Sequence, residues 1–224
     1  MSELMHTVRI LGKEQLTHDV ARLDLERPEG YLFTAGQAIE LTINQPGFLT
    51  DAAPFTLTGL STLESLEIIF KSYPSHNGMT LAMSGLKCGD TLRIGKAWDS
   101  FEYKSPGVFI AGGAGVTPFI AILRQLAATR RLNGNKLIFA NKTAEDIFLT
   151  DELAMLLGSN FLNILSREKH PSYAFGRIDA DFLKAHISSP DQAFYLCGPG
   201  SFSPDIKNLL LTLGAQEGLI ISEY

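Results

Sequence analysis

Residues 107–118, GVFIAGGAGVTP, run from a continuous apolar stretch into three closely spaced glycines. Such an apolar stretch is typical of a strand that is covered on both faces, as in a parallel sheet. The glycines permit a tight turn, and Pro118 suits the first turn of a following helix. These interruptions also argue against a membrane span in the uncharged residues 105–123. We therefore expect a strand, a loop and a helix here.

Strands and helices alternate from this stretch to the end of the chain. The expected helix covers residues 117–131, later strands cover residues 136–141, 161–166, 193–198 and 219–224, and later helices cover residues 150–158, 179–187 and 203–214. An alternation of this kind predicts a doubly wound parallel sheet. We assign residues 105–224 to this α/β domain.

Before residue 105 the pattern is different, because apolar and polar residues alternate with period two. Residues 21–26, 39–44 and 66–71 are examples. Strands with one buried and one wet face are typical of antiparallel sheets and small barrels. Helical spacing occurs only at residues 78–86. We therefore expect an antiparallel Greek-key β-barrel domain over residues 1–104.

Composition excludes several classes of function. The 224 residues carry a net charge of -5 without a basic run, which disfavours nucleic acid and anionic membranes as partners. Cys88 and Cys197 cannot supply the four thiolates of an iron–sulfur cluster. The five histidines form no metal-ligand spacing and no G-x-S-x-G motif is present, so we predict no metal site and no hydrolase. Residues 1–15 lack an apolar signal-peptide core, and the cytoplasm is the expected location.

Three loops should lie at the carboxyl edge of the parallel sheet, where open α/β sheets bind ligands. The loops hold Gly112, Gly113, Gly115, Val116, Thr117 and Pro118; Ser166 and Arg167; and Cys197, Gly198 and Pro199. Glycines let a backbone approach a ligand closely, a helix start offers free N–H groups, and an Arg beside a hydroxyl can hold a phosphate. Each loop can also be explained without a ligand: the glycines as tight turns, the Arg as a solvated surface residue, and the cysteine as an inert buried thiol.

The loops together resemble those of a known family. GGAGVTP at residues 112–118 and CGPG at residues 197–200, after a barrel-like half, resemble the ferredoxin–NADP reductase superfamily. Its members are flavoproteins, with a flavin barrel first and a nicotinamide domain second. The resemblance covers essentially the whole chain and is strongest to the bacterial ferredoxin and flavodoxin reductases.

The resemblance implies a flavin site on one barrel strand. The family motif R-x-Y-[ST] matches Ala53-Pro54-Phe55-Thr56. Thr56 keeps the hydroxyl that the family places near flavin N5, and Phe55 keeps an aromatic face. Ala53 departs from the motif, because the family's Arg binds the flavin phosphate. Loss of that charged contact should cost about 1.5–3 kcal/mol of affinity.

A second flavin motif is implied downstream. Gly78-Met79-Thr80 resembles the family's pyrophosphate motif and follows Phe70-Lys71, as the family's does. A short helix should begin here, with N–H groups that face the pyrophosphate. This site favours FAD over FMN as the cofactor.

The carboxyl terminus matches the family as well. Members end in an aromatic residue that covers the flavin and moves for nicotinamide, and Tyr224 matches it in kind and position. Glu223 lies one residue from the place of the family's acidic residue. The resemblance thus implies that Thr56, Cys197, Glu223 and Tyr224 surround the reacting atoms. Replacement of Tyr224 by Ser should then tighten nicotinamide binding.

For the coenzyme, Ser166-Arg167-Glu168 and the segment at residues 176–178 resemble the NADP-using bacterial branch, so NADP(H) is favoured over NAD(H). The implied activity is hydride transfer between NAD(P)H and bound FAD, with electrons passed on to a separate carrier such as flavodoxin or ferredoxin. Candidate docking residues are Arg124, Arg130, Arg131 and Lys142. Two alternatives stay open because of Ala53: a flavin reductase that releases free reduced flavin, and a flavin-less interaction or sensor module.

Overall fold

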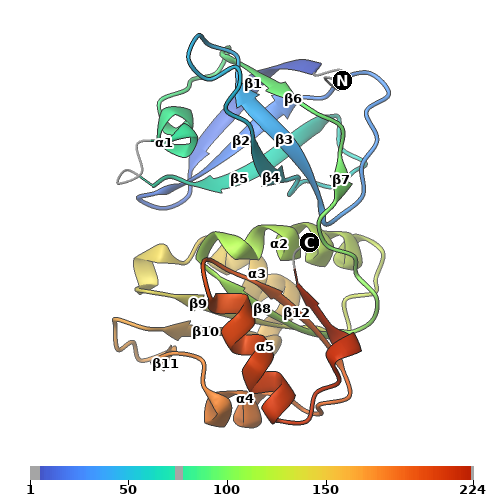
Figure 1. Ribbon diagram of the computed structural model, residues 1–224, viewed down its shortest axis with the longest axis vertical. Helices are drawn as coiled ribbons and strands as arrows, with labels where there is room; N and C mark the ends of the chain where they lie inside the picture. Colours follow the sequence, from blue (N-terminus) through green and yellow to red (C-terminus); the bar gives the residue numbers. More distant parts are fainter. Residues whose placement is uncertain (1–5, 74–77, 223–224) are drawn as a thin grey trace.

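The computed structural model of the protein describes residues 6–73 and 78–222. Two layers are stacked along the long axis, with an antiparallel sheet above a parallel sheet and α2 between them (Figure 1). The predicted order of the two architectures along the chain is confirmed.

The antiparallel layer is a seven-stranded sheet in the order β4-β3-β6-β1-β2-β5, with β7 paired to β3. Its strands are β1 (His6–Gln15), β2 (Val20–Glu26), β3 (Gln37–Ile43), β4 (Ala53–Thr56), β5 (Ser65–Lys71), β6 (Thr91–Ile94) and β7 (Trp98–Asp99). An isolated bridge between Leu57 and Ile68 brings the two edge strands together. The sheet is therefore a nearly closed barrel, as the period-two pattern predicts.

The barrel interior is filled by alternate residues of its strands. On β5 the inward side chains are Leu66, Ile68 and Phe70, all at most 3% exposed. Helix α1 (Met79–Ser84) adds Met79 and Met83 to the same core. One face of each strand is thus buried in the barrel, and the other face is left for solvent or for the second layer.

The second layer is a six-stranded sheet in the order β11-β10-β9-β8-β12-β13, and every pair in it is parallel. Its strands are β8 (Gly107–Gly112), β9 (Lys136–Asn141), β10 (Phe161–Leu165), β11 (Ala174–Phe175), β12 (Ala193–Cys197) and β13 (Ile220–Ser222). Its helices are α2 (Thr117–Ala128), α3 (Thr150–Leu157), α4 (Ala180–His186) and α5 (Phe202–Thr212), with short 3-10 turns η2 (Gly113–Val116), η3 (Ala144–Asp146), η4 (Gly158–Asn160) and η5 (Glu217–Leu219). The sequence patterns miss β11, which is only two residues long.

Helices cover both faces of this sheet. Phe109 and Ala111 of β8 face the core formed with α2 and α3, whereas Val108 and Ile110 face the core formed with α4 and α5. This two-sided burial explains the uninterrupted apolar run of β8. Helix α2 ends three residues before the predicted position, and Arg130 just beyond it has the left-handed φ of 57° that breaks helical geometry.

The two layers share a hydrophobic core. Val20 and Ile69 of the barrel belong to the same buried cluster as Phe109 and Phe119 of the α/β layer. Within residues 6–73 and 78–222, no helix has the length and apolarity needed to cross a membrane.

Candidate functional site

A cleft of about 310 Å³ lies where the barrel meets the carboxyl edge of the parallel sheet. Its volume is at the lower end of the range for small-molecule sites. It is lined by Ala53, Pro54, Phe55, Thr56, Ile69, Phe70, Lys71, Tyr73, Thr80, Gly112, Ala114, Gly115, Thr117, Pro118, Cys197, Gly198 and Pro199. The lining comes from strands β4 and β5 and helix α1 on one side, and from the loops after β8 and β12 on the other.

The α/β side of the cleft is the topological switch point of the sheet. Strands β8 and β12 are neighbours, with Ala111 opposite Cys197, and the strand order reverses between them. Their two loops leave the sheet side by side. At Gly115 an added Cβ would lie well inside 3.0 Å of the Cys197 backbone, so a residue without a side chain is required for this approach. The switch point of an open sheet is where such folds bind ligands.

The barrel side supplies a hydroxyl between apolar walls. Thr56 is 8% exposed and follows the buried Phe55 on β4. Ile69 and Phe70 of β5 continue the wall, and Thr80 of α1 adds a second hydroxyl. The cleft therefore offers aromatic and aliphatic surface with a few polar groups, the usual composition of a cofactor site.

Lys71 is the one charged side chain that lines the cleft in the described part of the chain. Its ammonium lies 2.9 Å from Asp19 Oδ2 and 3.3 Å from Asp146 Oδ1. Burial opposes the charge on Lys71, but the hydrogen bonds and charges of the two carboxylates outweigh it and raise its pKa. Burial likewise opposes the charge on Asp146, yet hydrogen bonds from Thr143 and the Lys71 charge hold the pKa of Asp146 below its usual value.

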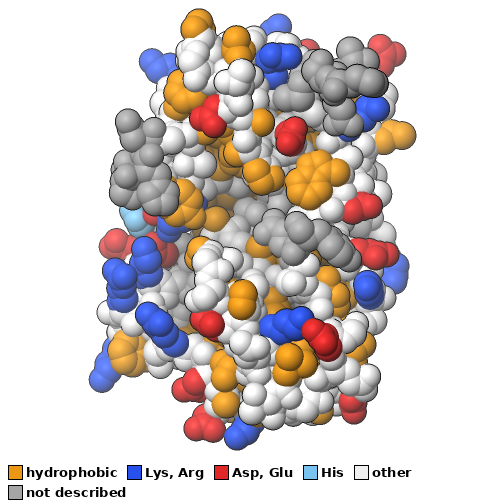
Figure 2. All heavy atoms as spheres, in the orientation of Figure 1, with side chains coloured by type: hydrophobic (Ala, Val, Ile, Leu, Met, Phe, Trp, Pro, Cys, Tyr) orange, Lys and Arg blue, Asp and Glu red, His pale blue; other side chains and the backbone are white. Residues whose placement is uncertain are grey.

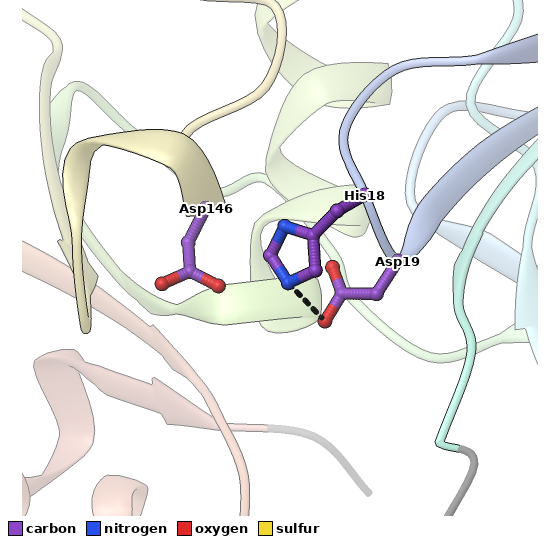
Figure 3. A group of neighbouring side chains, drawn as sticks. All are labelled: His18, Asp19 and Asp146. Carbon is purple, nitrogen blue, oxygen red and sulfur yellow. Dashed lines mark ion pairs between the residues drawn. The ribbon is translucent and has the colours of Figure 1, made fainter.

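Figure 3 shows His18, Asp19 and Asp146 pointing toward one another from the barrel and from η3. Their ligand atoms lie within 4.8 Å of one another, a spacing that could hold a metal ion. The Lys71 ammonium contacts both carboxylates and already compensates their charge. Asp19, Lys71 and Asp146 thus form a salt-bridge cluster that joins the barrel to the α/β layer.

Most of the residues that the sequence singles out lie on this cleft. Those in its lining are Pro54, Phe55, Thr56, Phe70, Lys71, Thr80, Gly112, Gly115, Thr117, Pro118, Cys197, Gly198 and Pro199. Gly78 is the N-cap of α1 and Gly113 begins η2, whereas the side chains of Met79 and Val116 are buried in hydrophobic cores. Glu223 and Tyr224 lie outside the described residues.

Ile69, Tyr73 and Ala114 also line the cleft and are not predicted from the sequence. Two of them follow the period-two pattern of a strand, because Ile69 lies two residues before Lys71 and Tyr73 two residues after it. Their positions fit one strand face that continues beyond β5.

Ser166 and Arg167 lie at the same edge of the sheet, beyond the cleft lining. Ser166 N donates to Asn141 O at 3.0 Å, and Arg167 N donates to Lys142 O at 2.9 Å. Lys142 and Arg167 are both exposed. Two cations thus come from neighbouring loops. Arg124, in contrast, is partly buried and forms ion pairs with Glu67 and Glu152, so our expectation that it contributes to a docking patch is wrong.

Comparisons with known proteins agree with this architecture. The family described as "Oxidoreductase NAD-binding domain" matches residues 109–208. NADH-cytochrome b5 reductase 1 of Aspergillus terreus is 30% identical in an alignment 235 residues long, which covers 94% of this chain and 78% of that protein. The chain belongs to the ferredoxin–NADP reductase superfamily. It is an oxidoreductase of that superfamily, as the paired glycine loops predict.

Other members of the superfamily extend the likeness. The reductase component of propane 2-monooxygenase from Rhodococcus jostii is 28% identical over 85% of this chain, which spans 55% of that protein. A ferredoxin NADP+ reductase from Neisseria gonorrhoeae, solved with bound FAD and NADP, has the same fold, with a TM-score of 0.84 at 23% identity and 98% coverage of both chains. The FAD/NAD-binding domain of the nitric oxide dioxygenase from Vibrio cholerae has a TM-score of 0.85 at 24% identity, with 97% coverage of both chains.

Proposed function

We propose that the chain is a flavoprotein reductase that transfers a hydride between NAD(P)H and bound FAD and passes electrons to a separate carrier protein. One observation carries the proposal. Strand β4, with Thr56, faces the glycine loops at Gly112 and Cys197 across a single cleft. This arrangement would bring two ring systems together, one held by each layer.

The cleft residues suit a flavin ring. Phe55 provides a flat aromatic surface, Ile69 provides an aliphatic one, and Thr56 and Thr80 provide hydroxyl donors. The cleft is less suited to the diphosphate group of FAD, because Ala53 occupies the position where the superfamily motif has an Arg. Lys71 lines the cleft but is already paired with two carboxylates.

A bound flavin supplies redox chemistry, since it accepts a hydride from reduced nicotinamide and can release electrons one at a time. The chain's own contribution is positioning and exclusion of water, because hydride transfer needs no general base to begin. Thr56 would orient the ring through its hydroxyl, and the backbone at Gly115 and Gly198 would admit the nicotinamide. Glu223 and Tyr224 lie outside the described residues, and their roles beside the reacting atoms remain predictions from the resemblance.

Lys142, Arg167 and Arg177 support NADP(H) as the preferred coenzyme, with NAD(H) as the alternative. All three are exposed. Figure 2 shows several basic side chains on the β9–β11 side of the α/β layer. Arg binds phosphate through charge-assisted hydrogen bonds that a plain ribose cannot match.

The electron acceptor is proposed as a small one-electron carrier such as flavodoxin or ferredoxin. Two relatives are named as reductases of other proteins: one is an NADH-cytochrome b5 reductase, and the other is the reductase component of a monooxygenase. Those names describe those proteins, and for this chain we propose only the class of electron acceptor. The cytoplasm and a domain boundary between residues 104 and 105 remain predictions.

Ala53 favours a second candidate function, reduction of a flavin that is bound weakly and released. Loss of the phosphate contact lowers affinity without removing the ring site. A flavin-less binding module is the third interpretation, and it predicts no redox activity at all.

The deciding experiment is the visible spectrum of purified protein, followed anaerobically while NADPH is added. We expect a flavin spectrum that bleaches. A protein without bound flavin that reduces added flavin over many turnovers would support the second candidate instead. A colourless protein that shows no bleaching after FAD is supplied would overturn both and leave the binding module.

A further inference from the structure

The two faces of strand β5 pack against different parts of the protein. Leu66, Ile68 and Phe70 fill the barrel core, whereas the alternate residues Glu67 and Lys71 point away from it. Ile69, between those two charges, belongs to the core of the α/β layer. The outward face is therefore a sequence of negative, apolar and positive side chains, spaced two residues apart.

The α/β layer presents the complementary sequence. Arg124 Nη1 on α2 lies 2.6 Å from Glu67 Oε1, and Asp146 Oδ1 of η3 lies 3.3 Å from Lys71 Nζ. In these two pairs across the interface each layer contributes one cation and one anion, and the apolar contact of Ile69 lies between them. All four side chains are at most 14% exposed, so water screens them little. Asp19 of the barrel also pairs with Lys71, and Glu152 of the α/β layer also pairs with Arg124.

Arg124 is the most constrained of these groups. Besides Glu67, its Nη1 donates to Thr58 O at 3.0 Å, and its Nε and Nη2 donate to the two oxygens of Glu152 on α3. Thr58 Oγ1 also donates to Glu67 Oε1 at 2.6 Å. Burial opposes the Arg124 charge, but hydrogen bonds and charges from Glu152 and Glu67 raise its pKa further. The guanidinium thus joins the barrel to two helices of the other layer.

The two ion pairs across the interface favour one alignment of the layers. A slide of two residues along β5, about 7 Å, would separate Glu67 from Arg124 and Lys71 from Asp146, and a slide of four residues would oppose like charges. Asp19 and Glu152 would stay with Lys71 and Arg124, because each belongs to the same layer as its cation. The slide therefore costs the two ion pairs across the interface, and charge complementarity of this kind fixes register.

We propose that the outward face of β5 fixes the register of the two layers, and that Glu67 and Arg124 are positioning residues for transfer between nicotinamide and flavin. The proposal rests on the proposed function for its second part. Helix α2 carries both Arg124 and the cleft residues Thr117 and Pro118, so a shift at one end moves the cleft wall at the other. Small misplacements of reacting groups cost large factors in rate.

The kinetic test compares Arg124→Met with Arg124→Lys and with Lys207→Met. Lys207 pairs with Glu217 at 2.7 Å within the α/β layer, at an exposed place, and is the matched control. In Arg124→Met, flavin reduction at saturating NADPH should slow about tenfold or more, with the NADPH dissociation constant nearly unchanged. Arg124→Lys keeps the positive charge but loses the two parallel hydrogen bonds of the guanidinium to Glu152, and it should recover part of the rate. A loss of thermal stability with an unchanged reduction rate would overturn the positioning role.

A second readout needs no flavin. Spin labels on the exposed Cys88 of the barrel and on Asp181→Cys of α4 report the distance between the layers. We expect one narrow distance distribution with Arg124 intact or with Lys207→Met, and a broadened or shifted one with Arg124→Met or Glu67→Gln. Unchanged distributions in both interface variants would overturn the register proposal. If NAD(P)H fails to reduce flavin in the unaltered chain, the proposed function fails, and the distance measurement still decides the register.

Discussion

The amide of Arg167 donates to the carbonyl oxygen of Lys142 at 2.9 Å, although the two residues follow different strands. Ser166 N and Oγ donate to Asn141 O beside them, and Ala144 N donates to Glu168 Oε2 at 2.7 Å. Main-chain bonds therefore hold two loops, each with an exposed cation, at one edge of the sheet. A 2′-phosphate is the part of NADP(H) that such a pair can distinguish.

Arg167→Ala should reduce selectivity for NADPH over NADH. One charge-assisted hydrogen bond contributes about 1.5–3 kcal/mol, so the ratio of kcat/KM values should fall about tenfold or more, mainly through weaker NADPH binding. Steady-state kinetics with both coenzymes measure the ratio. Arg131→Ala, which removes another exposed cation, is the control and should leave it unchanged. An unaltered ratio in Arg167→Ala would refute the assignment.

Ala53→Arg should strengthen flavin binding, because it returns a guanidinium to the position that binds phosphate in the superfamily motif. We expect the FAD dissociation constant to fall about tenfold or more. Quenching of flavin fluorescence measures it, and riboflavin, which has no phosphate, should show no gain. Ala52→Arg places the same charge on the neighbouring exposed residue. Equal gains in the two variants would show that general attraction, and not the motif position, is responsible.

Gly115→Ala should damage the nicotinamide side of the cleft. The added methyl group would overlap the Cys197 backbone, so the loops after β8 and β12 must separate, at a cost of about 1–3 kcal/mol in stability. Thermal unfolding measures the loss, and titration with NADP+ should show weaker binding while flavin affinity is retained. Gly218→Ala meets nothing within 4 Å and serves as the control. The close approach is unimportant if Gly115→Ala behaves as the control does.

Asp146→Asn should change how stability depends on pH. The pKa of Asp146 is lower in the folded protein than in the unfolded chain. The ionised carboxylate therefore stabilises the folded state at a pH above the pKa that Asp146 has in the unfolded chain, and this contribution is lost as the pH falls. The variant should be less stable than the unaltered chain at pH 7, and the difference should shrink below about pH 4. Denaturant unfolding at several pH values tests this. Asp181→Asn, at an exposed carboxylate, should show a small and constant difference, and the same result for Asp146→Asn would contradict the prediction.

The sequence by itself determined the two architectures and most of the cleft. Period-two alternation, as in Leu66, Ile68 and Phe70, requires a strand with one buried face, and the apolar run of β8 requires cover on both faces. The carboxyl ends of parallel strands lie at one edge of the sheet, so the sequence predicts that the loops at Gly112 and Cys197 meet there.

Only the tertiary structure decided what the charged residues do. Arg124 has the sequence context of an exposed helix residue, and Lys71 that of a cofactor ligand, yet both are paired across the layers. Periodicity reports which face of a strand or helix is buried, because burial depends on local alternation. It cannot report which distant carboxylate a cation meets, since that depends on how two separately patterned layers dock.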